Sequence, residues 1–205
     1  MKDFFKMVRN HLDFRFHATT GIELLVALSI LPCILFLPAK YGWENGILEN
    51  MQLIVLAIGF VLALTSKANK KFFIFVALVI TILALREVNC GRTIFFPVPG
   101  VENTFYKWKE IKYGYLAHPI YGLYMAIVGV YFLKNKLFLD LWEMIKKIKF
   151  PTWDIVFMLI GMGLGTYAEE CMHNFVAEEI TELLFYVALV GIIYLYSRNK
   201  LCQEA

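Results

Sequence analysis

Six apolar runs, each long enough or nearly long enough to cross a bilayer as a helix, dominate this chain. A helical span needs about 20 residues, and a backbone inside a bilayer must satisfy its own hydrogen bonds, which favours helices. The 205 residues are 60% hydrophobic and 18% charged, which is more apolar than a typical soluble domain. The sequence therefore predicts an all-α, polytopic integral membrane helical bundle of about six transmembrane helices. The expected spans lie near residues 21–38, 47–66, 72–89, 117–133, 153–170 and 180–196.

We expect one transmembrane domain over residues 21–198, because no internal repeat or long linker divides it. Residues 1–20 form an amphipathic cytoplasmic arm, for which we predict a helix over residues 1–17 lying among lipid headgroups. Thr20 and Glu23 have the T-x-x-E spacing of a capping box at the start of the first span. The other expected segments are an aromatic outer loop over 93–115, a basic amphipathic cytoplasmic segment over 134–150 and a tail over 199–205.

The distribution of Lys and Arg indicates how the spans are oriented. With six spans, 14 of the 20 basic residues fall in the two terminal segments and in the second-to-third and fourth-to-fifth connections. Basic residues are enriched in cytoplasmic loops. We therefore expect a multi-pass protein of the cell membrane, an inner membrane where two are present, with both termini cytoplasmic. The net charge of +3 then reflects topology, and no nucleic-acid-binding motif is present.

Charged and polar residues gather at the outer ends of successive apolar runs. Charges at membrane depth are costly and are usually kept with partners or for a task, so we expect an acidic pocket there. Acids outnumber bases on this side, which favours a cation, a proton or a polar headgroup as the ligand. Crowded carboxylates also favour proton uptake near neutral pH. The expected pocket residues are Glu49, Arg86, Glu87, Arg92, Glu169, Glu170, Glu178 and Glu179.

One pair in this region has the spacing of a metal site. Glu170 and His173 form an E-x-x-H motif, which puts both side chains on one helix face and occurs in carboxylate-bridged di-metal bundles. We therefore expect Glu170 and His173 to be ligands if a divalent metal is bound. The chain has no second E-x-x-H motif, so ion pairing remains an alternative role for these residues. Candidate acid–base groups are His118, His173 and Glu182.

Small and sulfur-containing residues mark two further features. Gly161 and Gly165 form a G-x-x-x-G face that permits close helix packing, either within the bundle or in a homo-oligomer. Cys90 and Cys171 both fall on the outer side, where a disulfide is allowed without being required. No nucleotide-binding, hydrolase or zinc-protease motif is present.

Three functions compete on this sequence. We prefer a membrane binding or sensing protein whose outer acidic pocket is coupled through a basic surface to a cytoplasmic protein partner. The second is a membrane-embedded, metal-dependent hydrolase or transferase acting on lipid-linked substrates. The third is an oligomeric channel or small transporter, for which the inner half of the spans shows no obvious polar counterpart to the outer cluster. Small membrane proteins of this kind also occur in stress-response or defence systems.

Overall fold

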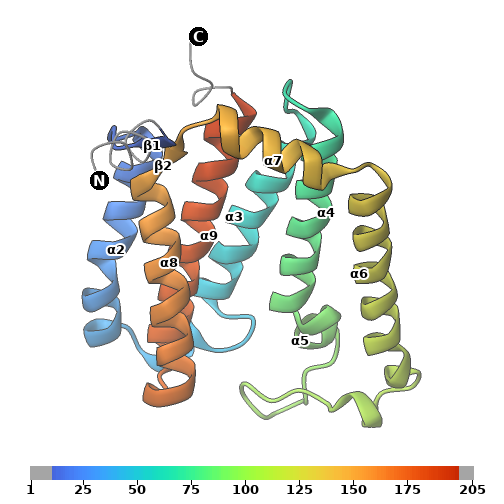
Figure 1. Ribbon diagram of the computed structural model, residues 1–205. Helices are drawn as coiled ribbons and strands as arrows, with labels where there is room; N and C mark the ends of the chain where they lie inside the picture. The colour runs from blue at the N-terminus through green and yellow to red at the C-terminus, as the bar shows by residue number, and fades with distance from the viewer. Residues whose placement is uncertain (1–10, 199–205) are drawn as a thin grey trace.

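The computed structural model describes residues 11–198, without the side chains of residues 145–147, as a bundle of long helices (Figure 1). Five segments are long and apolar enough to cross a membrane, and a sixth qualifies if a bent pair of helices counts as one span. The all-α prediction is confirmed, and each expected apolar run corresponds to one long helix. These helices are α2 (Ala18–Phe36), α3 (Ile47–Leu64), α4 (Lys70–Glu87), α6 (Ala117–Lys134), α8 (Thr152–Tyr167) and α9 (Phe175–Ser197).

The bundle has two different ends, between which the long helices run (Figure 1). What we call the arm end holds the start and finish of the described chain, together with β1 (Leu12–Asp13), β2 (Phe150–Pro151) and the amphipathic α7 (Leu137–Lys147). The opposite end, the loop end, holds the long connection between α4 and α6. The short elements at the loop end are η1 (Ala39–Gly42), η2 (Asn89–Gly91), α5 (Arg92–Phe95), η3 (Trp108–Glu110), η4 (Gly114–Leu116) and the π-helical η5 (Ala168–Met172).

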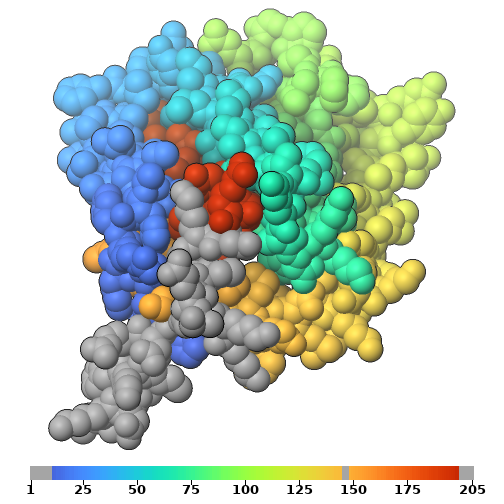
Figure 2. All heavy atoms as spheres, turned by 90° about the horizontal axis from the view of Figure 1, so that it is seen from above, coloured from blue at the N-terminus to red at the C-terminus, as the bar shows by residue number. Residues whose placement is uncertain are grey.

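Helix α9 forms the centre of the bundle. Helices α2, α3 and α8 all pack against it, and Figure 2 shows the red atoms of α9 lying between α2 in blue and the cyan and green-blue atoms of α3 and α4. Leu184 and Tyr186 of α9 have no exposed surface. Tyr186 belongs to a core cluster with Leu56 of α3 and Phe73 of α4. The central position of α9 brings residues from its two ends against several other helices.

Helices α8 and α9 approach closely because glycine faces the contact. A Cβ atom on Gly161 would lie 2.6 Å from the backbone nitrogen of Phe185, and one on Gly165 would lie 3.4 Å from Cγ of Glu182. In contrast, the space around the Cβ position of Gly163 is open. The G-x-x-x-G face therefore packs within the chain, as one of the two expected uses of this motif requires.

Helix α6 lies at the edge of the bundle and packs mainly against α4 and α7. Three of its tyrosine hydroxyls donate to backbone carbonyls of α4. Tyr121 reaches the oxygen of Ile82 over 3.4 Å, and Tyr124 reaches that of Leu78 over 3.3 Å. Tyr131 bonds the first turn of α4 in the same way. Hydroxyl donors thus replace part of the side-chain interdigitation that holds the other helices.

Residues 12–17 of the arm are not helical, so the helix predicted over residues 1–17 is wrong after His11; residues 1–10 lie outside the described residues. Leu12–Asp13 pairs in parallel with Phe150–Pro151. The Asp13 carboxylate turns back to accept a hydrogen bond from the backbone N–H of Arg15 over 3.0 Å. This local bond and the short strand pairing hold the segment extended where a surface helix was expected.

The predicted capping box at Thr20 and Glu23 is also wrong, because α2 begins three residues earlier than it requires. His17 is the residue before the first turn, and its backbone N–H donates to the Thr20 hydroxyl over 3.3 Å. Glu23 lies inside the helix with no exposed surface. It therefore needs a different explanation.

The chain turns sharply after α4. Asn89 and Cys90 have positive φ angles of 44° and 53°, and Gly91 follows at 88°. Helical turns before and after this break meet at 60°. Cys90 and Cys171 are both free thiols, so the disulfide that the sequence allows is not formed.

Candidate functional site: a carboxylate cluster at the loop end

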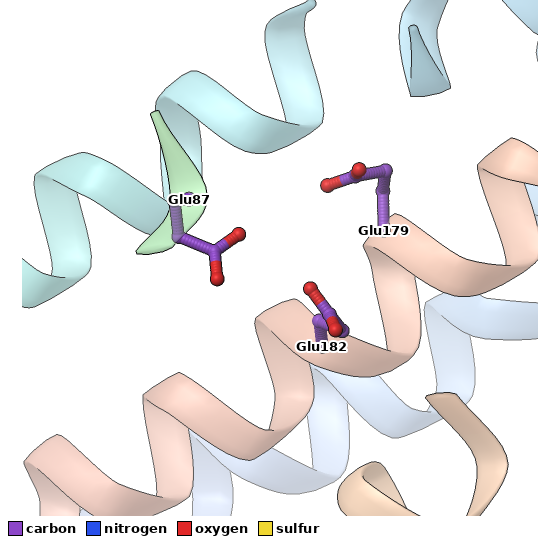
Figure 3. A group of neighbouring side chains, drawn as sticks. All are labelled: Glu87, Glu179 and Glu182. Carbon is purple, nitrogen blue, oxygen red and sulfur yellow. The ribbon is translucent and has the colours of Figure 1, made fainter. Parts of the chain in front are cut away.

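Three glutamates from two helices meet at the loop end. Glu87 lies at the last residue of α4, while Glu179 and Glu182 lie one turn apart near the start of α9. One carboxylate oxygen from each falls within 4.8 Å of the others. Figure 3 shows the three carboxylates turned toward a common space. We call Glu87, Glu179 and Glu182 the carboxylate cluster.

Arg86 and Tyr186 donate to the cluster from its sides. The Arg86 guanidinium bonds a Glu182 oxygen over 2.7 Å and lies 3.8 Å from Glu87. The Tyr186 hydroxyl donates to the same Glu87 oxygen over 2.5 Å. Glu87 and Glu182 keep only 6% and 17% of their side-chain surface exposed, whereas Arg86 keeps 56%. The single guanidinium is thus partly solvated, and the acids it faces are mostly not.

Helix α3 supplies two further polar groups to the same region. Gln52 has no exposed surface, and its amide donates to the backbone oxygen of Glu179 over 2.9 Å and to the Glu179 carboxylate over 2.7 Å. Glu49 is 4% exposed and accepts a hydrogen bond from the backbone N–H of Asn45. The second oxygen of Glu49 and the amide oxygen of Gln52 are both buried, and neither has a hydrogen-bond partner in the described part of the chain. Two buried acceptors are therefore left unsatisfied beside the cluster.

The balance of charge defines what the site can bind. If Glu49 and the three cluster glutamates are ionised, one Arg86 guanidinium offsets only one of four negative charges. Like charges that are withdrawn from water repel strongly, because the effective dielectric constant is low. Protons or a cation must relieve that repulsion. Carboxylate and amide oxygens are the ligands preferred by hard cations such as Ca²⁺, Mg²⁺ and Mn²⁺.

Two other expected pocket residues lie nearby but outside the cluster. Glu178 is half-buried in the first turn of α9. Arg92 begins α5, and its Nε atom is buried without a partner among the described residues. The sequence analysis predicted that five residues lie at the outer ends of the apolar runs, and the structure brings these five together at the loop end: Glu49, Arg86, Glu87, Glu179 and Glu182.

The E-x-x-H segment takes a different geometry from the one its spacing predicts. Residues Ala168–Met172 form a π-helical turn, and His173 has a φ angle of 49°, so the helix ends before the histidine. Nδ1 of His173 lies 2.9 Å from the backbone oxygen of Glu169. Glu169, Glu170 and His173 are all exposed, and none belongs to the carboxylate cluster. The expected shared helix face is lost because the backbone changes its winding there.

His118 lies apart from the cluster as well. It is exposed in the first turn of α6, where its ring packs edge-on against Trp108 at 6.1 Å between centroids. An aromatic contact in the long connection accounts for its position. Of the three candidate acid–base groups, only Glu182 reaches the cluster.

Sequence reasoning missed Gln52 and Tyr186. Both sit within apolar runs, where a single amide or hydroxyl reads as an ordinary core residue. The available signal was spacing: Gln52 lies three residues after Glu49, and Tyr186 lies four residues after Glu182, so each shares a helix face with an acid already identified.

Comparison of the chain with protein-family models, with curated proteins and with solved structures finds no match.

Proposed function

We propose that this chain is a multi-pass membrane protein that binds a hard divalent cation through Glu87, Glu179 and Glu182 and changes conformation in response. The observation that carries the proposal is the convergence of three carboxylates within 4.8 Å, drawn from two helices. The unpartnered, buried oxygens of Glu49 and Gln52 support it, since both point to a missing positive or donating group. A hard cation held by the three cluster carboxylates would offset the negative charge that gathers beside these acceptors.

The donor set favours this function over a metal-dependent enzyme. In the part of the chain that the structure describes, the groups that contact the cluster carry oxygen, apart from the Arg86 guanidinium and the Gln52 amide nitrogen. His118 and His173, the expected acid–base groups, are exposed in other elements. A pocket of oxygen ligands without a histidine suits Ca²⁺, Mg²⁺ or Mn²⁺ better than it suits zinc.

The proposed response follows from which elements the cation would join. Glu87 ends α4, while Glu179 and Glu182 begin α9, so a shared ion draws these two helix ends together. Because α9 runs through the core to the arm end, this change would be communicated to α7 and to a cytoplasmic partner. The distribution of Lys and Arg supports six spans with the arm end cytoplasmic and the cluster facing outward.

Manganese titration of purified protein tests the proposal. After treatment with a chelator, the protein in lipid nanodiscs is titrated with Mn²⁺, and the free ion is followed by electron paramagnetic resonance. We expect saturable binding of about one ion per chain, weakened roughly tenfold or more in Glu179→Gln and Glu182→Gln, because each loses a charged ligand. Competition by Ca²⁺ and Mg²⁺ ranks the cations.

The matched control is Glu102→Gln, which removes an exposed carboxylate from the long connection at the same end. We expect its Mn²⁺ affinity to equal that of the wild type. Absence of saturable binding, or equal affinities in the Glu102→Gln and Glu182→Gln proteins, would overturn the proposal.

A further inference from the structure

A pair of buried acids lies between helices at the arm end of the bundle, opposite the carboxylate cluster. Glu23 of α2 and Asp154 of α8 both have no exposed surface. A Cβ atom built on Gly191 of α9 would lie 2.7 Å from one oxygen of Glu23 and 3.4 Å from one oxygen of Asp154. The two carboxyl groups therefore converge on the same space beside Gly191.

The two acids differ sharply in the donors they receive. The Asp154 carboxylate accepts hydrogen bonds from the Thr19 hydroxyl over 2.6 Å and from the Thr20 hydroxyl over 2.9 Å. Among the described residues, neither oxygen of Glu23 receives a hydrogen bond from any N–H or O–H group. Within the described residues, the protein thus supplies hydrogen-bond donors to Asp154 and none to Glu23.

Over residues 11–198, no positive charge compensates the pair. Among the described residues, no Lys or Arg forms an ion pair with either acid. The other polar groups near it are Thr19 and Thr20 on α2 and Tyr194 on α9, with the Asp13–His17 pair beyond Thr20. A mostly apolar groove of about 400 Å³ runs beside Thr19 and Gly191. Two carboxylates buried there without a counter-charge would each lose the hydration of an ion and repel the other.

We propose that Glu23 and Asp154 form a proton-binding site in which one shared proton holds α2 against α8 and α9. Glu23 carries the proton and donates it to Asp154, so the Glu23 carboxyl group gains a hydrogen-bond partner. Close carboxyl pairs that hold a single proton are a known way to keep two acids together. Gly191 leaves the space that the pair occupies, since any side chain there meets the Glu23 oxygen.

The site also has a mechanical role. Helix α2 exposes much of its surface, including Leu25, Leu28 and Leu31, and it joins the bundle through α8 and α9. When the proton is removed, two like charges face each other at that contact. Separation of α2 from α8 is then the simplest way for water to reach them.

Infrared spectroscopy of the intact protein tests the assignment. At neutral pH we expect a carbonyl stretch of a protonated carboxylic acid that shifts in D₂O and is absent from Glu23→Gln. The Glu102→Gln protein must retain the band. Because Glu23→Gln preserves an N–H donor to Asp154, we expect it to fold. Absence of a band that Glu23→Gln removes would overturn the proposal.

A second variant covers the case in which Glu23→Gln does not fold. Thr19→Val removes one hydroxyl donor from Asp154 while leaving Glu23 in place. We expect it to displace the carboxylic acid band, because the strength of the shared hydrogen bond depends on how well Asp154 is solvated. An unchanged band in Thr19→Val would overturn the assignment to this pair.

Proton linkage gives a readout independent of spectroscopy. At neutral pH the folded protein would hold one proton that the unfolded chain has released. The unfolding constant of the wild type should then rise by about one additional factor of ten per pH unit, compared with the unfolding constant of Glu23→Gln. Identical pH dependences in the two proteins would contradict the proposal. Mn²⁺ binding at the carboxylate cluster involves different residues, so failure of either proposal is distinguishable from failure of the other.

Discussion

The Arg86 guanidinium donates to Glu182 over 2.7 Å, joining the end of α4 to the second turn of α9. Because Arg86 is the one cation that contacts the carboxylate cluster among the described residues, its removal has opposite effects with and without a bound ion. We expect Arg86→Gln to lower the free energy of unfolding of the cation-free protein by about 1–2 kcal/mol, since the guanidinium is half exposed. Its affinity for Mn²⁺ should rise, because a nearby positive charge is gone.

Thermal unfolding and Mn²⁺ titration measure the two effects on one preparation. Lys112→Gln is the control, since it removes an exposed positive charge from the same end of the bundle. An Arg86→Gln protein with unchanged or weaker Mn²⁺ affinity would show that Arg86 does not compete with the cation.

Gln52 gives a pair of substitutions with divergent outcomes. Gln52→Leu removes two donors from Glu179 in a site with no exposed surface, and we expect a loss of about 1–3 kcal/mol in the free energy of unfolding. Gln52→Glu adds a fifth carboxylate to the region. It should destabilise the cation-free protein but regain stability as Mn²⁺ is added, and thermal melts across a Mn²⁺ series distinguish the two. Similar Mn²⁺ responses in both variants would contradict a cation site.

Tyr186→Phe deletes one hydroxyl and leaves the core packing of its ring in place. Since the hydroxyl donates to the buried Glu87 over 2.5 Å, we expect a loss of about 1–3 kcal/mol in unfolding free energy. Tyr196→Phe on the same helix is the matched control, and it should change stability by less than about 0.5 kcal/mol. Chemical or thermal denaturation of the two proteins side by side provides the comparison; equal losses would show that the Glu87 bond is unimportant.

Two glycines two residues apart in α8 test its contact with α9. Gly161→Ala places a methyl group 2.6 Å from the Phe185 backbone, and overpacking of this kind costs about 1–3 kcal/mol. Gly163→Ala meets nothing within 4 Å and should stabilise the helix by up to about 1 kcal/mol. Melting temperatures that move in opposite directions are the expected result. A stable Gly161→Ala protein would mean that α8 and α9 separate easily.

Asp13 provides a prediction with pH as the variable. Burial acts to raise the pKa of this carboxyl, but the hydrogen bonds and charge of Arg15 outweigh it and hold the pKa below its ordinary value. Such a group stabilises the fold above its unfolded-state pKa and loses that effect as the pH falls through the folded-state pKa.

We therefore expect Asp13→Asn to cost about 1–2 kcal/mol at neutral pH. The difference from the wild type should begin to shrink as the pH falls below the ordinary Asp pKa of about 3.9 and should vanish once the pH is below the lowered pKa of folded Asp13. Parallel denaturation curves at several pH values measure it. A difference that stays constant into strong acid would mean that Asp13 acts through its shape alone.

The apolar runs predict the helices well, because a span must be continuous and apolar whatever its neighbours are. They also predict the loop-end acids, since Glu49, Glu87 and Glu182 each sit at the end of a run. Depth within the bundle is a different matter. Asp154 is two residues after the start of α8 and reads as an ordinary first-turn acid, so its meeting with Glu23 follows only from how α2 and α8 pack.

Local backbone winding was the other source of error. The E-x-x-H spacing assumes 3.6 residues per turn, and the π-helical turn at Ala168–Met172 breaks that assumption. The arm shows the same limit, because the pairing of Leu12 with Phe150 joins residues that are distant in sequence. Neither feature leaves a periodic pattern in the chain.

Helix α9 contributes residues both to the carboxylate cluster and to the site of Glu23 and Asp154. Glu182 and Gly191 are nine residues apart in sequence, which corresponds to about 14 Å along a helix at 1.5 Å per residue. An unbroken helix resists stretching along its axis. An axial displacement of α9 at one site therefore displaces the helix by a similar distance at the other. A shift or tilt of α9 that changes the geometry of one proposed site therefore changes the geometry of the other proposed site as well.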